Sequence, residues 1–304
     1  MGPERPSAAP AAIAIVVAYF LIYVVWGSTY YFIGVAMRQL PPFVLGALRF
    51  TTAGLLLLAW CGWRRERVFA WELIRKSAVS GVVLLFIDQA VIMLAQRYVS
   101  SSLVAIIASS TAIWIMALDA PMWRRNFRSL SIVGGIVLGF FGVVMLYAEQ
   151  AAAGDDSVST RGVLILVFGC LSWALGTLYA KYRSGDAEAV NAFGGTAWQM
   201  IIAGGVFWAC ALFRGEVGET NFATTPATTW LTLAYLVVFG SILAYSAYIW
   251  LLKVRPAAEV GTYAYVNPLI AVFFGGVFGG EHISVTQMAG LAVILASVAL
   301  VSRR

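Results

Sequence analysis

Histidine, cysteine and acidic residues are scarce in this chain. Its 304 residues include one histidine, three cysteines and 14 acidic residues. No histidine and carboxylate stand at a metal-ligand spacing, and Cys61, Cys170 and Cys210 lie far apart in apolar segments. The scarcity excludes a zinc site and a disulfide framework, so we expect no metal and read the cysteines as packing residues.

Catalytic and nucleotide-binding motifs are also missing. The lone histidine, His282, has no nucleophile at a suitable spacing, and no glycine-rich loop precedes a basic residue. The chain is therefore predicted not to be an enzyme, to need no cofactor and not to be a self-contained ATP-driven pump. A channel is disfavoured because no ring of charges or repeated filter is visible.

Long apolar runs dominate instead. Hydrophobic residues make up 61% of the chain and charged residues only 11%. Ten segments, most of them near the ~20 residues that cross a bilayer as a helix, cover roughly residues 11–37, 43–63, 74–95, 101–121, 130–147, 162–181, 192–213, 229–252, 257–280 and 285–301. The pattern predicts an all-α integral membrane protein with ten transmembrane helices.

The basic residues fall in every second connection. Fifteen of the 20 lie on one predicted side, four (Arg38, Arg97, Arg161 and Arg214) lie on the other, and Arg49 lies within a span. This asymmetry predicts that both termini are cytoplasmic. It also accounts for the net charge of +6, so we expect no nucleic-acid partner.

The chain divides into two halves of five spans. We predict a disordered N-terminus over 1–10, a first repeat over 11–147, an extracytoplasmic linker over 148–161 and a second repeat over 162–304. Because five is odd, the repeats must be inverted, and Trp26 and Thr111 correspond to Trp173 and Asn267. Inverted repeats place a substrate site near the bilayer midplane where the halves meet.

Four short motifs in their order and spacing resemble a known family. They are Trp26-Gly27-Ser28-Thr29, Leu48-Arg49-Phe50, Tyr265-Val266-Asn267-Pro268, and Gly280-Glu281 followed by Gln287 and Gly290. The chain resembles the EamA-type ten-helix exporters of the drug/metabolite transporter superfamily, and within it the bacterial amino acid exporters. The resemblance implies a cavity between spans 1 to 4 and 6 to 9, alternating access, and a place in the bacterial inner membrane.

Two charged side chains are predicted to lie inside the spans. A charge inside a bilayer costs free energy, so each of them is expected to have a partner or a function. Arg49 and Asp88 lie at matching depth and could form a structural pair. Alternatively, Asp88 could contact a cation or carry a proton for coupling, and Arg49 could bind a substrate carboxylate. Glu281 is interpreted as a residue at the entry of the last helix, where a carboxylate is favoured by the helix dipole.

Polar and aromatic side chains near the span midpoints suggest a cavity lining. Pro268 is expected to kink span 9, although a passive packing kink is the alternative. The candidate cavity residues are Trp26, Tyr30, Asp88, Gln89, Ser110, Thr111, Trp114, Trp173, Thr177, Tyr179, Trp198, Gln199, Tyr245, Tyr263 and Asn267.

A gradient-driven or facilitative exporter of small metabolites is the function these features favour. Aromatic walls with few charges suit amino acids, aromatic or large neutral ones first, and cationic or amphipathic drugs are the alternative. The expected partners are the small-molecule substrate and the lipid bilayer, with proton coupling possible. A monomer is expected, and a dimer is left open.

Overall fold

The computed structural model describes residues 12–123, 128–152, 160–183, 192–255, 260–261 and 263–302. The predicted disordered segment 1–10 lies outside the described residues, as does 153–159 within the predicted linker. All regular structure of the described residues is helical. The fold class predicted from the apolar runs is therefore confirmed.

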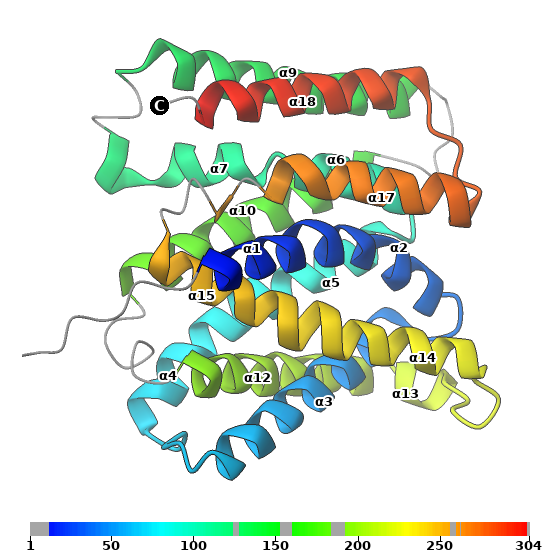
Figure 1. The fold of residues 1–304 in the computed structure, drawn as a ribbon. Coiled ribbons are helices and arrows are strands. Elements are labelled where there is room, and N and C mark those ends of the chain that lie inside the picture. The colour runs from blue at the N-terminus through cyan, green and yellow to red at the C-terminus, as the bar shows by residue number, and fades with distance from the viewer. Residues whose placement is uncertain are drawn as a thin grey trace, which may run out of the picture.

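The first half contains spans 1 to 5 (Figure 1). Span 1 comprises α1 (Ala12–Phe20), η1 (Leu21–Val25) and α2 (Trp26–Ala36); span 2 is α3 (Pro42–Trp63); span 3 comprises α4 (Trp71–Ser80), η2 (Gly81–Ile87) and α5 (Asp88–Ala95); span 4 comprises α6 (Ser101–Ala108) and α7 (Thr111–Leu118), followed by η3 (Ala120–Met122); span 5 is α9 (Leu130–Ala152).

The second half contains spans 6 to 10. Span 6 is α10 (Thr160–Arg183); span 7 is α12 (Ala192–Phe213), followed by the short α13 (Glu216–Glu219); span 8 comprises α14 (Ala227–Tyr235), η5 (Leu236–Tyr245) and α15 (Ser246–Val254); span 9 is α17 (Tyr263–Gly279); span 10 is α18 (Val285–Ser302). The helices α9 and α10 extend into the predicted linker from both sides. Residues 256–259 and 262, at the start of the apolar run predicted from 257, lie outside the described residues.

Length and apolarity support ten crossings. Within the described residues, seven helical stretches are at least 18 residues long and apolar enough to cross a membrane, and they correspond to spans 1 to 4 and 6 to 8. Shorter apolar stretches, Leu130–Gly139, Val266–Gly279 and Val285–Ser297, fall in spans 5, 9 and 10. The helices that contain them, α9, α17 and α18, are 23, 17 and 18 residues long, which is close to the ~20 residues that cross the hydrocarbon layer.

Equivalent helices of the two halves pack against each other. Spans 2 and 7 (α3 and α12) form one such pair and spans 5 and 10 (α9 and α18) another, at opposite edges of the molecule in Figure 1. Glycines make the first contact close, since a Cβ on Gly54 would lie 2.9 Å from the Ile201 backbone nitrogen and one on Gly204 2.7 Å from that of Thr51. Such pairing is what a two-fold axis in the membrane plane produces.

The two faces of the molecule differ in their connections. We call the face where α1 begins and α3 and α15 end the basic face (left in Figure 1). The opposite face, which carries connections 37–41, 96–100, 214–226 and 280–284, is called the Glu281 face (right in Figure 1). The charge asymmetry predicts that the basic face is cytoplasmic.

Several spans are irregular at mid-depth. Spans 1, 3 and 8 contain the π-helical segments η1, η2 and η5, and span 4 breaks at Ser109 and Ser110. The sequence shows no proline at any of these four places. Irregular backbone within a bilayer is tolerated where it faces protein or a cavity, and π-turns are frequent at functional sites.

Candidate functional site

A cavity lies where the two halves meet. From the first half it is lined by Trp26, Thr29, Tyr30, Ile33, Arg49, Phe50, Leu85, Asp88, Gln89, Ile92, Ala108 and Thr111, and from the second by Trp173, Gly240, Tyr245, Tyr263 and Asn267. These residues come from spans 1 to 4, 6, 8 and 9. The volume open to the centres of water molecules is about 60 Å³. Ligand pockets usually measure about 300 to 1,000 Å³, so the cavity is small in this conformation.

Trp26 is the centre of an aromatic cluster that spans the two halves. Its ring centroid lies 5.5 Å from that of Trp173, 5.1 Å from Tyr248 and 5.5 Å from Tyr263, and the last two come from spans 8 and 9. Its indole nitrogen donates a hydrogen bond to the Gly240 carbonyl at 3.0 Å. One ring of the first half is therefore held by three rings and a carbonyl of the second.

A chain of polar side chains crosses the cavity wall. Arg49 donates through Nε to the Ser241 hydroxyl at 2.8 Å and through Nη1 to Oε1 of Gln89 at 2.9 Å. The Gln89 amide nitrogen donates in turn to the Asp88 carboxylate at 2.9 Å. Among the described residues no ion pair joins Arg49 directly to Asp88, so the predicted pair meets through Gln89.

The burial of this chain constrains its chemistry. Arg49 is 3% exposed and Asp88 is 8% exposed. Within the described part of the chain, two of the five guanidinium N–H groups have acceptors, and one Asp88 oxygen accepts from Gln89. Arg49 therefore retains donors, and Asp88 an acceptor oxygen, at the edge of the cavity.

Asn267 joins spans 1 and 9 at the same depth. With its amide oriented by its surroundings, its nitrogen donates to the carbonyls of Tyr23 at 2.7 Å and Ile22 at 2.9 Å. Both carbonyls belong to η1, where the π-turn displaces the regular backbone hydrogen bonds. The irregularity of span 1 thus supplies the acceptors for the central amide of span 9.

Nine of the fifteen candidate residues line this cavity. They are Trp26, Tyr30, Asp88, Gln89, Thr111, Trp173, Tyr245, Tyr263 and Asn267. Thr177 and Gln199 lie directly behind the wall, because their side chains bond the hydroxyls of Tyr248 at 2.8 Å and Tyr245 at 2.6 Å.

The other four candidates lie elsewhere. Ser110 is buried against Cys170, and Trp114 packs beside Ile115, Ala174 and Leu178. Tyr179 and Trp198 lie towards the basic face, where Tyr179 borders a pocket with Arg75 and Lys76, and Trp198 donates to the Val68 carbonyl at 2.7 Å. Position near a span midpoint did not reveal which way these side chains point.

Sequence reasoning missed several lining residues. Thr29, Ile33, Phe50, Leu85, Ile92, Ala108 and Gly240 carry no polar or aromatic signal that distinguishes them from ordinary packing residues, apart from Thr29 and Phe50, which stand within the quoted motifs. Pro268 is buried in the second turn of α17 and outside the lining, and the kink there stays a prediction.

Two carboxylates of the second half cap helices of the first half at the Glu281 face. Glu281 accepts from the backbone nitrogens of Ser101 and Ser102, both at 3.1 Å, and from their hydroxyls, both at 2.5 Å. Glu281 was expected at the entry of α18, but its carboxylate lies at the N-terminus of α6. A helix N-terminus has unpaired N–H groups and a positive dipole end, which explains the contact.

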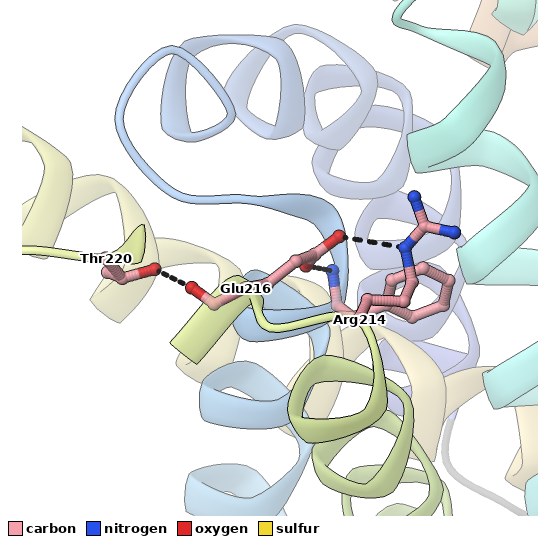
Figure 2. A network of polar contacts seen from close by, with 4 residues as sticks. Arg214, Glu216 and Thr220 are labelled. Carbon is pink, nitrogen blue, oxygen red and sulfur yellow. Dashed lines mark hydrogen bonds and ion pairs between the residues drawn. The ribbon is translucent and has the colours of Figure 1, made fainter. Parts of the chain in front are cut away.

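The second cap is Glu216, in the network of Figure 2. Its Oε2 accepts from the backbone nitrogen of Phe43 at 2.9 Å, at the start of α3, and its Oε1 lies 3.5 Å from Nε of Arg214. The hydroxyl of Thr220 donates to its backbone carbonyl at 2.7 Å. The two caps therefore join the two halves at two places on the Glu281 face.

Comparison with known proteins agrees with the ten-helix architecture. The model of the EamA-like transporter family matches residues 12–148 and 160–303. The chain belongs to this family. The uncharacterised inner membrane transporter YedA of Escherichia coli K12 is 31% identical over 287 residues, which cover 94% of this chain and 89% of that one.

More distant relatives cover similar lengths. The uncharacterised transporter YvbV of Bacillus subtilis is 26% identical over 96% of this chain and 92% of its own. A probable amino-acid metabolite efflux pump of Salmonella typhimurium is 23% identical over 91% of each chain. A solved crystal structure matches 98% of this chain and 100% of its own with a TM-score of 0.68 at 18% identity, which shows a common fold. The protein is a membrane transporter for small molecules.

Proposed function

We propose that this transporter exports amino acids, aromatic or large neutral ones first, by alternating access through the central cavity. The observation that carries the proposal is the chain from Arg49 through Gln89 to Asp88 beside the Trp26 aromatic cluster. In an α-amino acid the carboxylate and the ammonium group are bonded to the same carbon. Arg49 offers donors to the carboxylate and Asp88 offers an acceptor to the ammonium.

The spacer between the two charges favours a zwitterion. If Arg49 and Asp88 paired directly they would neutralise each other, whereas Gln89 occupies one contact of each and leaves the rest available. Charge-assisted hydrogen bonds are about twice as strong as neutral ones. Each contact that Arg49 or Asp88 makes with the substrate would therefore stabilise the bound state strongly in a site without water. The rings of Trp26, Trp173 and Tyr263 would enclose the apolar side chain.

The small cavity volume supports alternating access. Ligand pockets usually measure about 300 to 1,000 Å³, so a cavity of about 60 Å³ is small for phenylalanine, and we expect the aromatic cluster to open before a substrate enters. The cluster joins the two halves through Trp26, and carboxylate caps join the halves again at the Glu281 face. These contacts support the inference that this conformation is closed at the Glu281 face, which the charge pattern predicts to be extracytoplasmic.

Reconstitution in liposomes tests the proposed substrate class. We expect flux of phenylalanine above that of threonine, and little flux of a quaternary ammonium compound, which has no carboxylate for Arg49. The substitution Arg49→Gln should lower phenylalanine flux at least about tenfold, because it removes one charge-assisted contact worth about 1.5 to 3 kcal/mol. Arg97→Gln, which removes a charge outside the cavity, is the matched control.

Export of cationic or amphipathic drugs is the second candidate. Asp88 and the tyrosine rings around it could hold a cation without help from Arg49. Quaternary ammonium flux that survives Arg49→Gln and disappears in Asp88→Asn would support this candidate and overturn the amino acid proposal.

A further inference from the structure

A second cavity opens on the Glu281 face, among the ends of spans 1, 3 and 9 and the start of span 4. Its volume, about 190 Å³ by the same measure, is larger than that of the central cavity. Its polar lining consists of Tyr31, Arg38, Gln96, Ser100, Ser101 and Glu281. The cavity has room for a polar group of several atoms.

Opposite charges line this cavity. Arg38 is exposed, and its side chain makes no hydrogen bond or ion pair with the residues that the structure describes. Glu281 is half-buried and supplies the negative charge. A ligand with both an anionic and a cationic group would therefore find a partner for each.

Gln96 adds a buried acceptor without a donor. Its amide nitrogen donates to the Tyr30 carbonyl at 3.0 Å, which fixes the orientation of the amide. Its Oε1 is buried and has no hydrogen-bond donor among the described residues. A Cβ on Gly34 would lie 3.6 Å from this oxygen, so the glycine at that position keeps the space beside it open. A buried acceptor of this kind is costly unless a ligand or water supplies the N–H or O–H group.

We propose that this cavity is a second binding site for an α-amino acid, which places its carboxylate at Arg38 and its ammonium at Gln96 Oε1 and Glu281. The inference rests on the proposed function, because it assigns the same zwitterionic substrate to a place between the central cavity and the outside. The ammonium would compete with Ser101 and Ser102 for the Glu281 carboxylate. Since Glu281 and α6 belong to different halves, binding here would weaken a contact that closes the face.

Calorimetric titration of the purified protein with L-phenylalanine tests the site. We expect two binding events in the wild type and one in Arg49→Gln, which leaves the outer site intact. In the Arg49→Gln background, Arg38→Gln should weaken the remaining event at least about tenfold, the loss expected for one charge-assisted contact. Gln96→Leu should weaken it as well, and Arg97→Gln, a charge removed from the same face outside the cavity, should not.

Two ligand analogues separate the two charges. Phenethylamine lacks the carboxylate, so its affinity should not change in Arg38→Gln. In the same way, 3-phenylpropionate lacks the ammonium, so its affinity should not change in Gln96→Leu. A single binding event in the wild type, lost in Arg49→Gln and unchanged by Arg38→Gln and Gln96→Leu, would overturn the outer site and leave the proposed function standing. Binding that depends on Arg38 without phenylalanine flux in liposomes would instead overturn the proposed function and leave the site standing.

Discussion

Asp88 is a buried carboxylate in span 3, and its surroundings show what it can bind. Asp88 is surrounded by titratable or charged groups from three other spans, since Tyr30 of α2, Arg49 of α3 and Tyr263 of α17 line the same cavity. None of them forms an ion pair with Asp88 among the described residues. A carboxylate in such a place can accept either a substrate cation or a proton.

Proton coupling through Asp88 gives a pH prediction. If Asp88 must take up and release a proton in each cycle, wild-type flux will vary with pH and flux through Asp88→Asn will be lower and independent of pH. The measurement is phenylalanine flux in liposomes between pH 5 and pH 9, with Glu219→Gln, an exposed carboxylate near the Glu281 face, as the control. An unchanged pH profile in Asp88→Asn would remove the coupling idea.

At the scale of single residues, the sequence singles out charges and aromatics but not their neighbours. Arg49, Asp88 and the central tryptophans were selected because polar or charged groups inside a bilayer need partners. The role of Gln89 as spacer and of Gly240 as acceptor could not be predicted, because both depend on side chains and carbonyls of other spans.

At the scale of the helices, the π-helical segments could not be predicted from the sequence. The spans were found from apolar length, but η1, η2 and η5 leave no mark in composition. Each is next to the site or within it: η1 precedes Trp26, η2 precedes Asp88, and η5 contains Gly240 and Tyr245. Pro268, the residue of span 9 for which the sequence predicts a kink, lies within the continuous helix α17 and outside the cavity lining.

The close approach of α2 and α17 gives a prediction at the scale of the helices. A Cβ on Gly27 would lie 2.7 Å from Cβ of Ile270 and 3.1 Å from Cα of Asn267. Gly27→Ala should therefore push spans 1 and 9 apart, lower the stability by about 1 to 3 kcal/mol, the usual cost of overpacking, and reduce flux. Thermal unfolding in detergent measures the change, and Gly205→Ala is the control, since a Cβ there has no heavy atom within 4 Å.

A Gly27→Ala variant as stable as Gly205→Ala would show that spans 1 and 9 can separate freely at this point. The contact would then be no constraint on how the two halves pack around Asn267.

For the whole molecule, charge and length in the sequence were sufficient for ten spans and an inverted repeat. The pairing of equivalent helices, span 2 with 7 and span 5 with 10, was not predicted, because apolar helices of similar composition do not specify their neighbours. The contact between Glu281 and α6 was missed for the same reason. These contacts are non-local, so they emerge only when both halves are folded.

Alternating access predicts that locking the Glu281 face blocks transport. A Cβ on Gly275 would lie 2.5 Å from the Ser102 hydroxyl, so Ser102→Cys with Gly275→Cys brings two thiols of α6 and α17 close together. The same Cβ would lie 2.5 Å from Oε2 of Glu281, so the end of that side chain must shift. In a background without Cys61, Cys170 and Cys210, oxidation of this pair should abolish phenylalanine flux, and a reductant should restore it, because spans 4 and 9 must separate at this face. The pair Gly142→Cys with Val293→Cys joins α9 and α18, which contribute no residue to the cavity in the described part of the chain. Its oxidation should leave most of the flux, and full flux through the oxidised 102 and 275 pair would mean that substrates do not pass between spans 4 and 9.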